Sequence, residues 1–126
     1  MSCLFDSIAA LLKIEGGGSA LRQDCIDYLV SNFEVNGVPI DQWLKWESND
    51  DTATLAAYAA RMRRQDAWGG GLELAAMAQL LRVQIAVHLV QPAGGGCAAE
   101  FGGGRRRVNL LYNGSHYTPS HVSELN

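Results

Sequence analysis

The 126-residue sequence lacks a long apolar run, a large net charge and a leader-like start, and each shortage excludes a class of protein. No apolar stretch is long enough to cross a bilayer. The first dozen residues have no basic region and carry Asp6 within an apolar run, which argues against a signal peptide. A formal net charge of -3 indicates neither nucleic acid nor a membrane surface as a partner. We therefore expect a cytosolic or nucleoplasmic location, with the cytoplasm as our prediction. We also expect a monomer.

Cysteine is also scarce. The three residues Cys3, Cys25 and Cys97 are widely spaced and form no Cys-x-x-Cys pair, so neither a disulfide framework nor a zinc site is indicated. The glycine-rich "WGGGLEL" lacks the Gly-Lys-Ser/Thr of a phosphate-binding loop and follows no strand-like run, which argues against a nucleotide site. We expect reduced thiols and neither a metal nor an organic cofactor.

The length and the 48% hydrophobic content fit a single domain over residues 1–126, and there are no internal repeats. Apolar residues at helical spacing predict four amphipathic helices, of which the last is the most apolar and is expected to be buried. The first helix begins at residue 4, and the other three lie within residues 19–33, 51–65 and 69–83. Ser19 is the expected N-cap of the second helix, and Asp51 or Thr52 that of the third. A short helical turn is expected around Trp43 and Leu44.

The C-terminal third has the pattern of strands. Residues 83–90 are rich in β-branched side chains, and residues 107–112 and 115–120 flank an Asn-Gly pair that predicts a hairpin. The intervening residues 91–107 are dominated by glycine, which predicts a mobile surface loop or a loose hairpin. The expected fold class is therefore α+β, with helices packed on a small, mainly antiparallel C-terminal sheet.

Cys3 stands at the first turn of the first predicted helix. Unpaired backbone N–H groups and the helix dipole favour negative charge there, so the pKa of a thiol at this position should fall toward the nucleophilic thiolate. The alternative is that Cys3 serves only as a small apolar residue at the helix start.

A catalytic cysteine needs an imidazole within hydrogen-bond reach, and a third polar group usually orients the imidazole. His116 follows the predicted turn and lies where the hairpin end could face the first helix. Thr118, two residues later on the same strand face, is the candidate for orienting it. His88 lies inside a strand and fits a half-buried structural role, and His121 has no obvious partner.

Four segments together resemble the ovarian tumour (OTU) family of cysteine peptidases, in the family's order: "CLFDSIAALL", "LRQDCIDYLVSNF", "YAARMRRQDAWGGGLELAAMAQLLRVQIAV" and "VNLLYNGSHYTPS". The resemblance covers nearly the whole chain and implies a papain-like α+β fold. It also implies an activity that releases ubiquitin from modified proteins, with Cys3 as nucleophile and His116 as general base. On the same resemblance, Trp68 and Gly69 are structural and pack and turn the chain into the core helix.

Two positions depart from the family pattern. Family members usually carry an Asp-Gly-x segment before the cysteine, whose amides help to hold the oxyanion, whereas only Met1 and Ser2 precede Cys3. They commonly have Asp or Asn two residues after the histidine, where this chain has Thr118; Asn113 is explained by the turn. Two hypotheses remain: a ubiquitin hydrolase, or a weakly active or inactive OTU-like module that binds ubiquitin or a ubiquitin-like protein.

Two groups of charged residues receive structural interpretations. Glu73 is expected to cap its helix, pair with an arginine or face solvent. The arginines at 105–107 are interpreted as a solvated hairpin end, because no interleaved aromatic residues accompany them. A role of these arginines in positioning a partner protein stays open.

Overall fold

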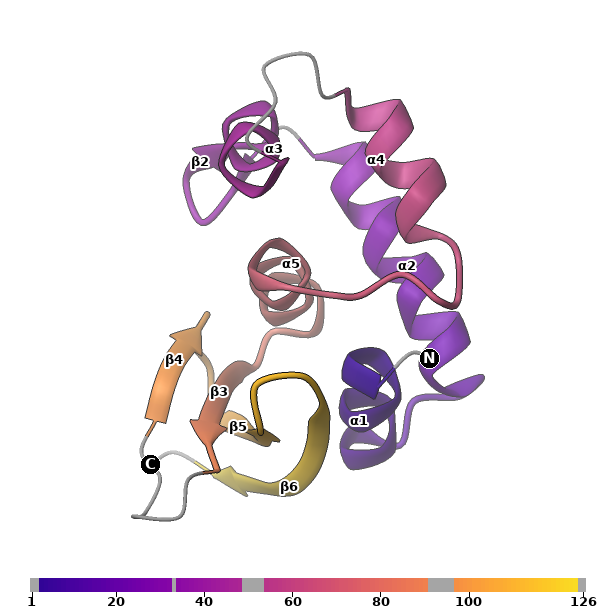
Figure 1. Cartoon of the computed structure of the whole chain (residues 1–126). Helices are drawn as coiled ribbons and strands as arrows, with labels where there is room; N and C mark the ends of the chain where they lie inside the picture. The colour runs from indigo at the N-terminus through magenta and orange to yellow at the C-terminus, as the bar shows by residue number, and fades with distance from the viewer. Residues whose placement is uncertain (1–2, 33, 49–53, 91–96, 125–126) are drawn as a thin grey trace.

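The computed structural model describes residues 3–32, 34–48, 54–90 and 97–124, and within them five helices precede or flank a four-stranded sheet (Figure 1). The helices are α1 (Cys3–Leu12), α2 (Gly17–Ser31), α3 (Ile40–Ser48), α4 (Leu55–Met62) and α5 (Gly71–Leu81). The strands are β1 (Glu34–Val35), β2 (Val38–Pro39), β3 (Gln84–Leu89), β4 (Cys97–Phe101), β5 (Arg106–Tyr112) and β6 (Tyr117–Glu124). In the described part of the chain, no helix is long and apolar enough to span a bilayer.

The helices form two layers over one face of the sheet. α1 packs beside β5 and β6, and α5 packs beside β3 and β4. α2 lies across α1 and α5 and carries α4 on its outer side (Figure 1). Every residue of α5 from Leu72 to Ala78 is buried, which confirms that the most apolar predicted helix is the central one. The α+β class with helices on the C-terminal sheet is likewise confirmed.

The helix starts differ from those expected. α2 begins at Gly17 after a left-handed Gly16, and the Ser19 hydroxyl donates to Gln65 Oε1 at 3.0 Å instead of capping the helix. Thr54 is the N-cap of α4, where its Oγ1 accepts a hydrogen bond from the backbone N of Ala57 at 3.2 Å. The expected caps at positions 51 and 52 lie outside the described residues. The turn expected around residues 43 and 44 is a nine-residue helix, α3.

The sheet has the strand order β4-β3-β5-β6. The pairs β3/β4 and β5/β6 are antiparallel, as expected, but the central pair β3/β5 is parallel. The parallel pair arises because β4 folds back along one edge of β3 and the chain then crosses to the other edge. Part of the glycine-rich stretch is therefore an ordered hairpin strand, β4, and residues 91–96 lie outside the described residues.

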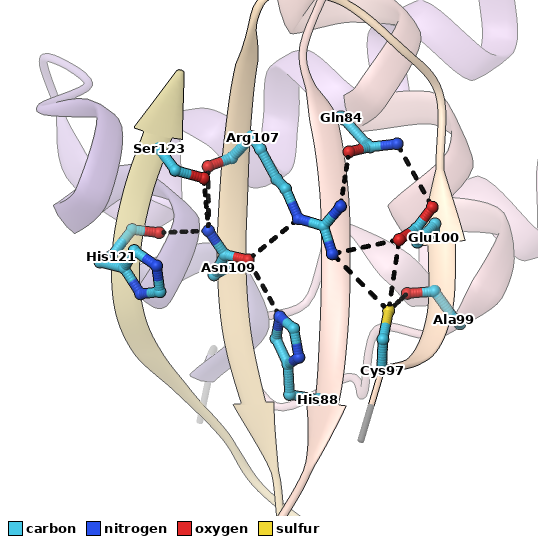
Figure 2. A network of polar contacts seen from close by, with 9 residues as sticks. All are labelled: Gln84, His88, Cys97, Ala99, Glu100, Arg107, Asn109, His121 and Ser123. Carbon is cyan, nitrogen blue, oxygen red and sulfur yellow. Dashed lines mark hydrogen bonds and ion pairs between the residues drawn. The ribbon is translucent and has the colours of Figure 1, made fainter. Parts of the chain in front are cut away.

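The two faces of the sheet differ in chemistry. Ile85, Val87, Val108 and Leu110 belong to the buried core beneath the helices. The opposite face carries a polar network, in which the Arg107 side chain reaches across β3 to an ion pair with Glu100 of β4 at 3.1 Å (Figure 2). This arginine is thus part of the sheet surface and departs from the solvated hairpin end expected of residues 105–107.

Candidate active site

The N-terminal end of α1 lies next to the start of β6. α1 begins at Cys3, and one turn later the Ser7 hydroxyl donates to the backbone O of Tyr117 at 3.3 Å. His116 immediately precedes Tyr117. The two residues proposed from the sequence as nucleophile and base therefore belong to neighbouring segments, although 113 positions separate them along the chain.

The turn before β6 fixes the backbone of His116. The Asn113 side-chain oxygen accepts hydrogen bonds from the backbone N of Ser115 at 3.0 Å and of His116 at 2.8 Å. The backbone N of Asn113 donates to the His116 carbonyl at 3.2 Å. At the base of the hairpin the rings of Tyr112 and Tyr117 stack with centroids 4.5 Å apart. The structural interpretation of Asn113 is confirmed, since its carboxamide oxygen is engaged in the turn.

Trp68 lies against the imidazole of His116. The two ring centroids are 5.5 Å apart and the planes are inclined by 46°. Trp68 is 59% exposed, so the structural packing expected of it is a surface contact with His116. The adjacent Gly69 sits so close to α1 that a Cβ there would lie 2.6 Å from Leu4 Cδ2. Residues 68–69 thus touch both the start of α1 and the His116 turn.

Arg22 of α2 holds the segment that leads to Trp68. Its side chain is fully buried, with Nη1 donating to the Met62 carbonyl and Nη2 to the Ala67 carbonyl, both at 2.8 Å. The guanidinium carbon lies 4.4 Å from the centroid of the Phe5 ring in α1. One side chain therefore connects α1, α2, the end of α4 and the approach to the site.

Glu73 of α5 holds the other side of the same segment. Its Oε1 accepts a hydrogen bond from the backbone N of Gly70 at 2.6 Å, and the carboxylate also accepts the hydroxyl of Tyr58. Burial lowers the pKa of the Arg22 guanidinium, and the negative charge of Glu73 opposes that shift. The structural role expected for Glu73 is confirmed, but the group is 2% exposed and does not face solvent.

The sequence interpretation missed Arg22. A signal was present, because Arg22 precedes Cys25 and Ile26 by three and four residues and so shares their apolar stripe. An arginine on such a stripe must find partners in the interior.

The two other thiols differ from each other. Cys25 is buried as expected, its thiol donates toward the Glu73 carbonyl at 3.9 Å, and burial together with the Glu73 charge raises its pKa. Cys97 lies on strand β4 and not in the loop where it was expected. Its Sγ is 3.9 Å from Arg107 Nη2 and 3.6 Å from Glu100 Oε1 (Figure 2).

In the described part of the chain, the remaining candidate side chains make no hydrogen bond to the His116 ring. His88 is half-buried and its Nε2 is 2.9 Å from Asn109 Oδ1, which fits the structural role expected for it. His121 is exposed, with Nδ1 2.9 Å from the Ser120 hydroxyl. Thr118 is exposed in β6 opposite Leu111, and the described residues include no hydrogen bond from its hydroxyl to the His116 ring. In the described ranges, no three His, Cys, Asp or Glu side chains gather closely enough to hold a metal ion.

Solved structures of similar fold include an OTU domain in complex with ubiquitin, with a TM-score of 0.74 and 20% identity over 98% of this chain and 69% of that one. The Hazara virus OTU bound to ubiquitin has a TM-score of 0.73 and 20% identity over 99% of this chain and 76% of that one. These likenesses show the fold.

Sequence relatives carry the comparison further. The ubiquitin thioesterase OTU1 of Drosophila pseudoobscura is 29% identical over 126 residues, which are 96% of this chain and 32% of that protein. The Drosophila melanogaster protein is 30% identical over 129 residues, with 96% and 33% covered. The chain spans about a third of the length of the curated relatives it matches. Residues 2–121 match the OTU-like cysteine protease family. The resemblance noted in the sequence is confirmed, and the chain belongs to the OTU-like cysteine protease family.

Proposed function

We propose that this chain is a cysteine-type deubiquitinase, which hydrolyses the bond after the C-terminal glycine of ubiquitin. The observation that carries the proposal is the meeting of three segments: the start of α1 with Cys3, the turn with His116, and residues 68–69. Membership of a cysteine protease family and likeness to proteins named ubiquitin thioesterases support it. Solved OTU folds that hold ubiquitin support ubiquitin as the partner.

The proposed reaction has two halves. The Cys3 thiol gives its proton to His116 and the sulfur attacks the carbonyl carbon of the terminal glycine. The resulting tetrahedral intermediate collapses to a thioester as His116 returns the proton to the leaving amine. Water then attacks the thioester with His116 accepting its proton, and the Cys3 sulfur leaves and is reprotonated. Thr118 is proposed to orient His116.

The alternative is a module that holds ubiquitin and turns over slowly. It is favoured by one observation, the neutral and exposed Thr118 at the position where the family commonly has an acid or amide. A neutral hydroxyl does not stabilise the imidazolium that forms when the thiol loses its proton. Loss of the carboxylate costs about 10⁴-fold in a serine protease triad.

Ubiquitin bearing a C-terminal electrophile tests the nucleophile. We expect covalent labelling of the parent chain and of Cys25→Ala and Cys97→Ala, and none of Cys3→Ala, detected as a mass increase of the intact protein. Labelling that persists in a folded Cys3→Ala variant refutes the assignment. Binding without labelling in the parent favours the module.

The two candidate histidines are separated by a matched pair of variants. His116→Ala should abolish hydrolysis of a ubiquitin-amide reporter and leave ubiquitin affinity nearly unchanged, because the imidazole moves a proton and adds little contact area. His88→Ala should lower thermal stability and keep activity, because His88 is bonded to Asn109. Equal loss of activity in both folded variants would contradict the choice of His116.

Thr118→Asp tests the third position. A carboxylate there should stabilise the imidazolium, so we expect a gain of about two- to tenfold in turnover, smaller than the serine protease effect because a helix N-terminus already favours a thiolate. Thr118→Val is the control for shape. A fast parent enzyme that Thr118→Asp does not improve would mean that Thr118 has no part in the site.

A further inference from the structure

The backbone on both sides of Trp68 is anchored by hydrogen bonds. The carbonyl of the preceding residue, Ala67, accepts from Arg22 Nη2 at 2.8 Å. The backbone N of Gly70, two residues after Trp68, donates to Glu73 Oε1 at 2.6 Å. Arg22 belongs to α2 and Glu73 to α5, so these two helices define where residues 67–70 lie.

Burying the charged side chains of Arg22 and Glu73 costs free energy, so stability alone does not explain their placement. Replacing buried charged groups with apolar residues of similar volume is often neutral or stabilising, so burial of Arg22 and Glu73 is weak support for a purely stabilising role. The residue placed between the two anchors contributes little burial either, because Trp68 is 59% exposed. What the anchors define is the position of an exposed indole against the His116 ring, at 5.5 Å between centroids.

Close packing at Gly69 tightens the same geometry. A Cβ at Gly69 would lie 2.6 Å from Leu4 Cδ2, so the backbone beside Trp68 lies against the first turn of α1. The indole therefore has a defined position relative to both the proposed nucleophile's helix and the proposed base.

We propose that Trp68 is a positioning residue for His116, and that Arg22 and Glu73 form the clamp that holds its indole on the imidazole. The inference rests on the proposed function. The indole restricts rotation of the His116 ring. Trp68 thus supplies part of the orientation of this ring, to which Thr118 makes no hydrogen bond among the described residues.

Steady-state kinetics on a ubiquitin-amide reporter test the role of the indole. Trp68→Ala should lower kcat by about tenfold and change KM by less than about twofold, because misplacement of a base acts on the chemical step. Trp68→Phe retains a π face and should recover most of kcat. Trp46→Ala is the matched control, because Trp46 is 61% exposed and lies edge-on to Trp43. Trp46→Ala should keep the parent's kcat.

Two readouts do not depend on ubiquitin hydrolysis, so failure of the proposed function and failure of this inference are distinguishable. In NMR spectra the His116 imidazole protons should lose their ring-current shift in Trp68→Ala and retain it in Trp68→Phe. The rate at which the Cys3 sulfur displaces iodide from iodoacetamide should fall several-fold in Trp68→Ala and not in Trp46→Ala. A parent chain that does not cleave ubiquitin but shows both effects refutes only the proposed function.

The clamp is tested by Arg22→Lys, which keeps the charge but replaces a fork that reaches two carbonyls with a single ammonium. A folded Arg22→Lys variant should lose kcat in the same direction as Trp68→Ala, with a weaker ring-current shift at His116. Unchanged kcat and alkylation rate in Trp68→Ala overturn the inference, as does a loss confined to KM. An unchanged His116 spectrum and kcat in Arg22→Lys overturn the clamp.

Discussion

Replacing Arg22 by Met should destabilise the fold more than any surface change. The substitution removes two 2.8 Å hydrogen bonds from a charged donor to the carbonyls of Met62 and Ala67. It also leaves the carboxylate of Glu73, which is 2% exposed, without its cationic neighbour. Charge-assisted bonds contribute about 1.5–3 kcal/mol each, and removing one partner of a buried ion pair costs about 3–5 kcal/mol. We expect a loss of about 3–5 kcal/mol, a large part of the 5–15 kcal/mol typical of a domain.

Urea unfolding followed by far-UV circular dichroism measures this loss. With a slope of about 1–3 kcal/mol per M, the unfolding midpoint should fall by about 2 M. Arg63→Met is the matched control, because Arg63 Nη2 pairs with Asp27 Oδ1 at the same 2.8 Å but at the surface, where the Asp27 side chain is 64% exposed. That pair should contribute less than about 1 kcal/mol.

The double variant Arg22→Met/Glu73→Gln separates the charge effect from packing. It removes the uncompensated carboxylate, so the loss of stability in the double variant should be about 1–3 kcal/mol smaller than the sum of the two single losses. The reasoning is refuted if Arg22→Met costs no more than Arg63→Met. It is also refuted if the two single losses simply add, because the buried pair would then have no coupling.

Three further perturbations follow from the structure. The folded chain keeps Cys25 protonated because burial raises the pKa of its thiol. Above the ordinary pKa of 9.0, the free energy of unfolding should therefore fall by up to about 1.4 kcal/mol per pH unit. Urea titrations at several pH values should show this slope in the parent chain and not in Cys25→Ala. Thr54→Ala removes the hydroxyl that caps α4 and should lower stability by about 1 kcal/mol, measured as a midpoint shift; no shift would mean that the cap contributes nothing. Gly69→Ala should lower the free energy of unfolding by about 1–3 kcal/mol, because its Cβ meets Leu4. Gly103→Ala, whose Cβ has open space, is the control and should leave the calorimetric melting temperature unchanged.

Local pattern determined most of the secondary structure. The helical spacing of apolar residues located α1, α2 and α5, and the Asn113-Gly114 pair located the β5/β6 hairpin, because these signals act between residues close in sequence. The sequence pattern was a poorer guide to the residues that cap the helices. Ser19 had the right chemistry, but the chain enters α2 through a left-handed Gly16, a choice set by packing of α2 on α1.

The sequence pattern did not predict the relative direction of the strands. A β-branched run predicts a strand without specifying the direction of its neighbour. Parallel strands need a crossover connection, so the parallel contact of β3 with β5 depended on how β4 returns along the sheet edge. The assignment of Cys97 to a loop was wrong because glycine-rich flanks predict a loop, whereas pairing with β3 makes the residues between them a strand.

The chemistry of the site divides in the same way. The sequence by itself determined which residue types belong to cysteine chemistry, since a thiol at a helix start and a histidine after a turn are local features, and the family's motifs assigned them to Cys3 and His116. The contact of Trp68 with His116 is visible only in the tertiary structure, as is the hydrogen bond from Arg22 to the Ala67 carbonyl beside it. The Gly70–Glu73 hydrogen bond spans three positions and is the local helix cap that the sequence predicts. The Trp68–His116 and Arg22–Ala67 contacts join residues 48 and 45 positions apart, and no local spacing specifies them, because packing decides which buried carbonyl an arginine reaches.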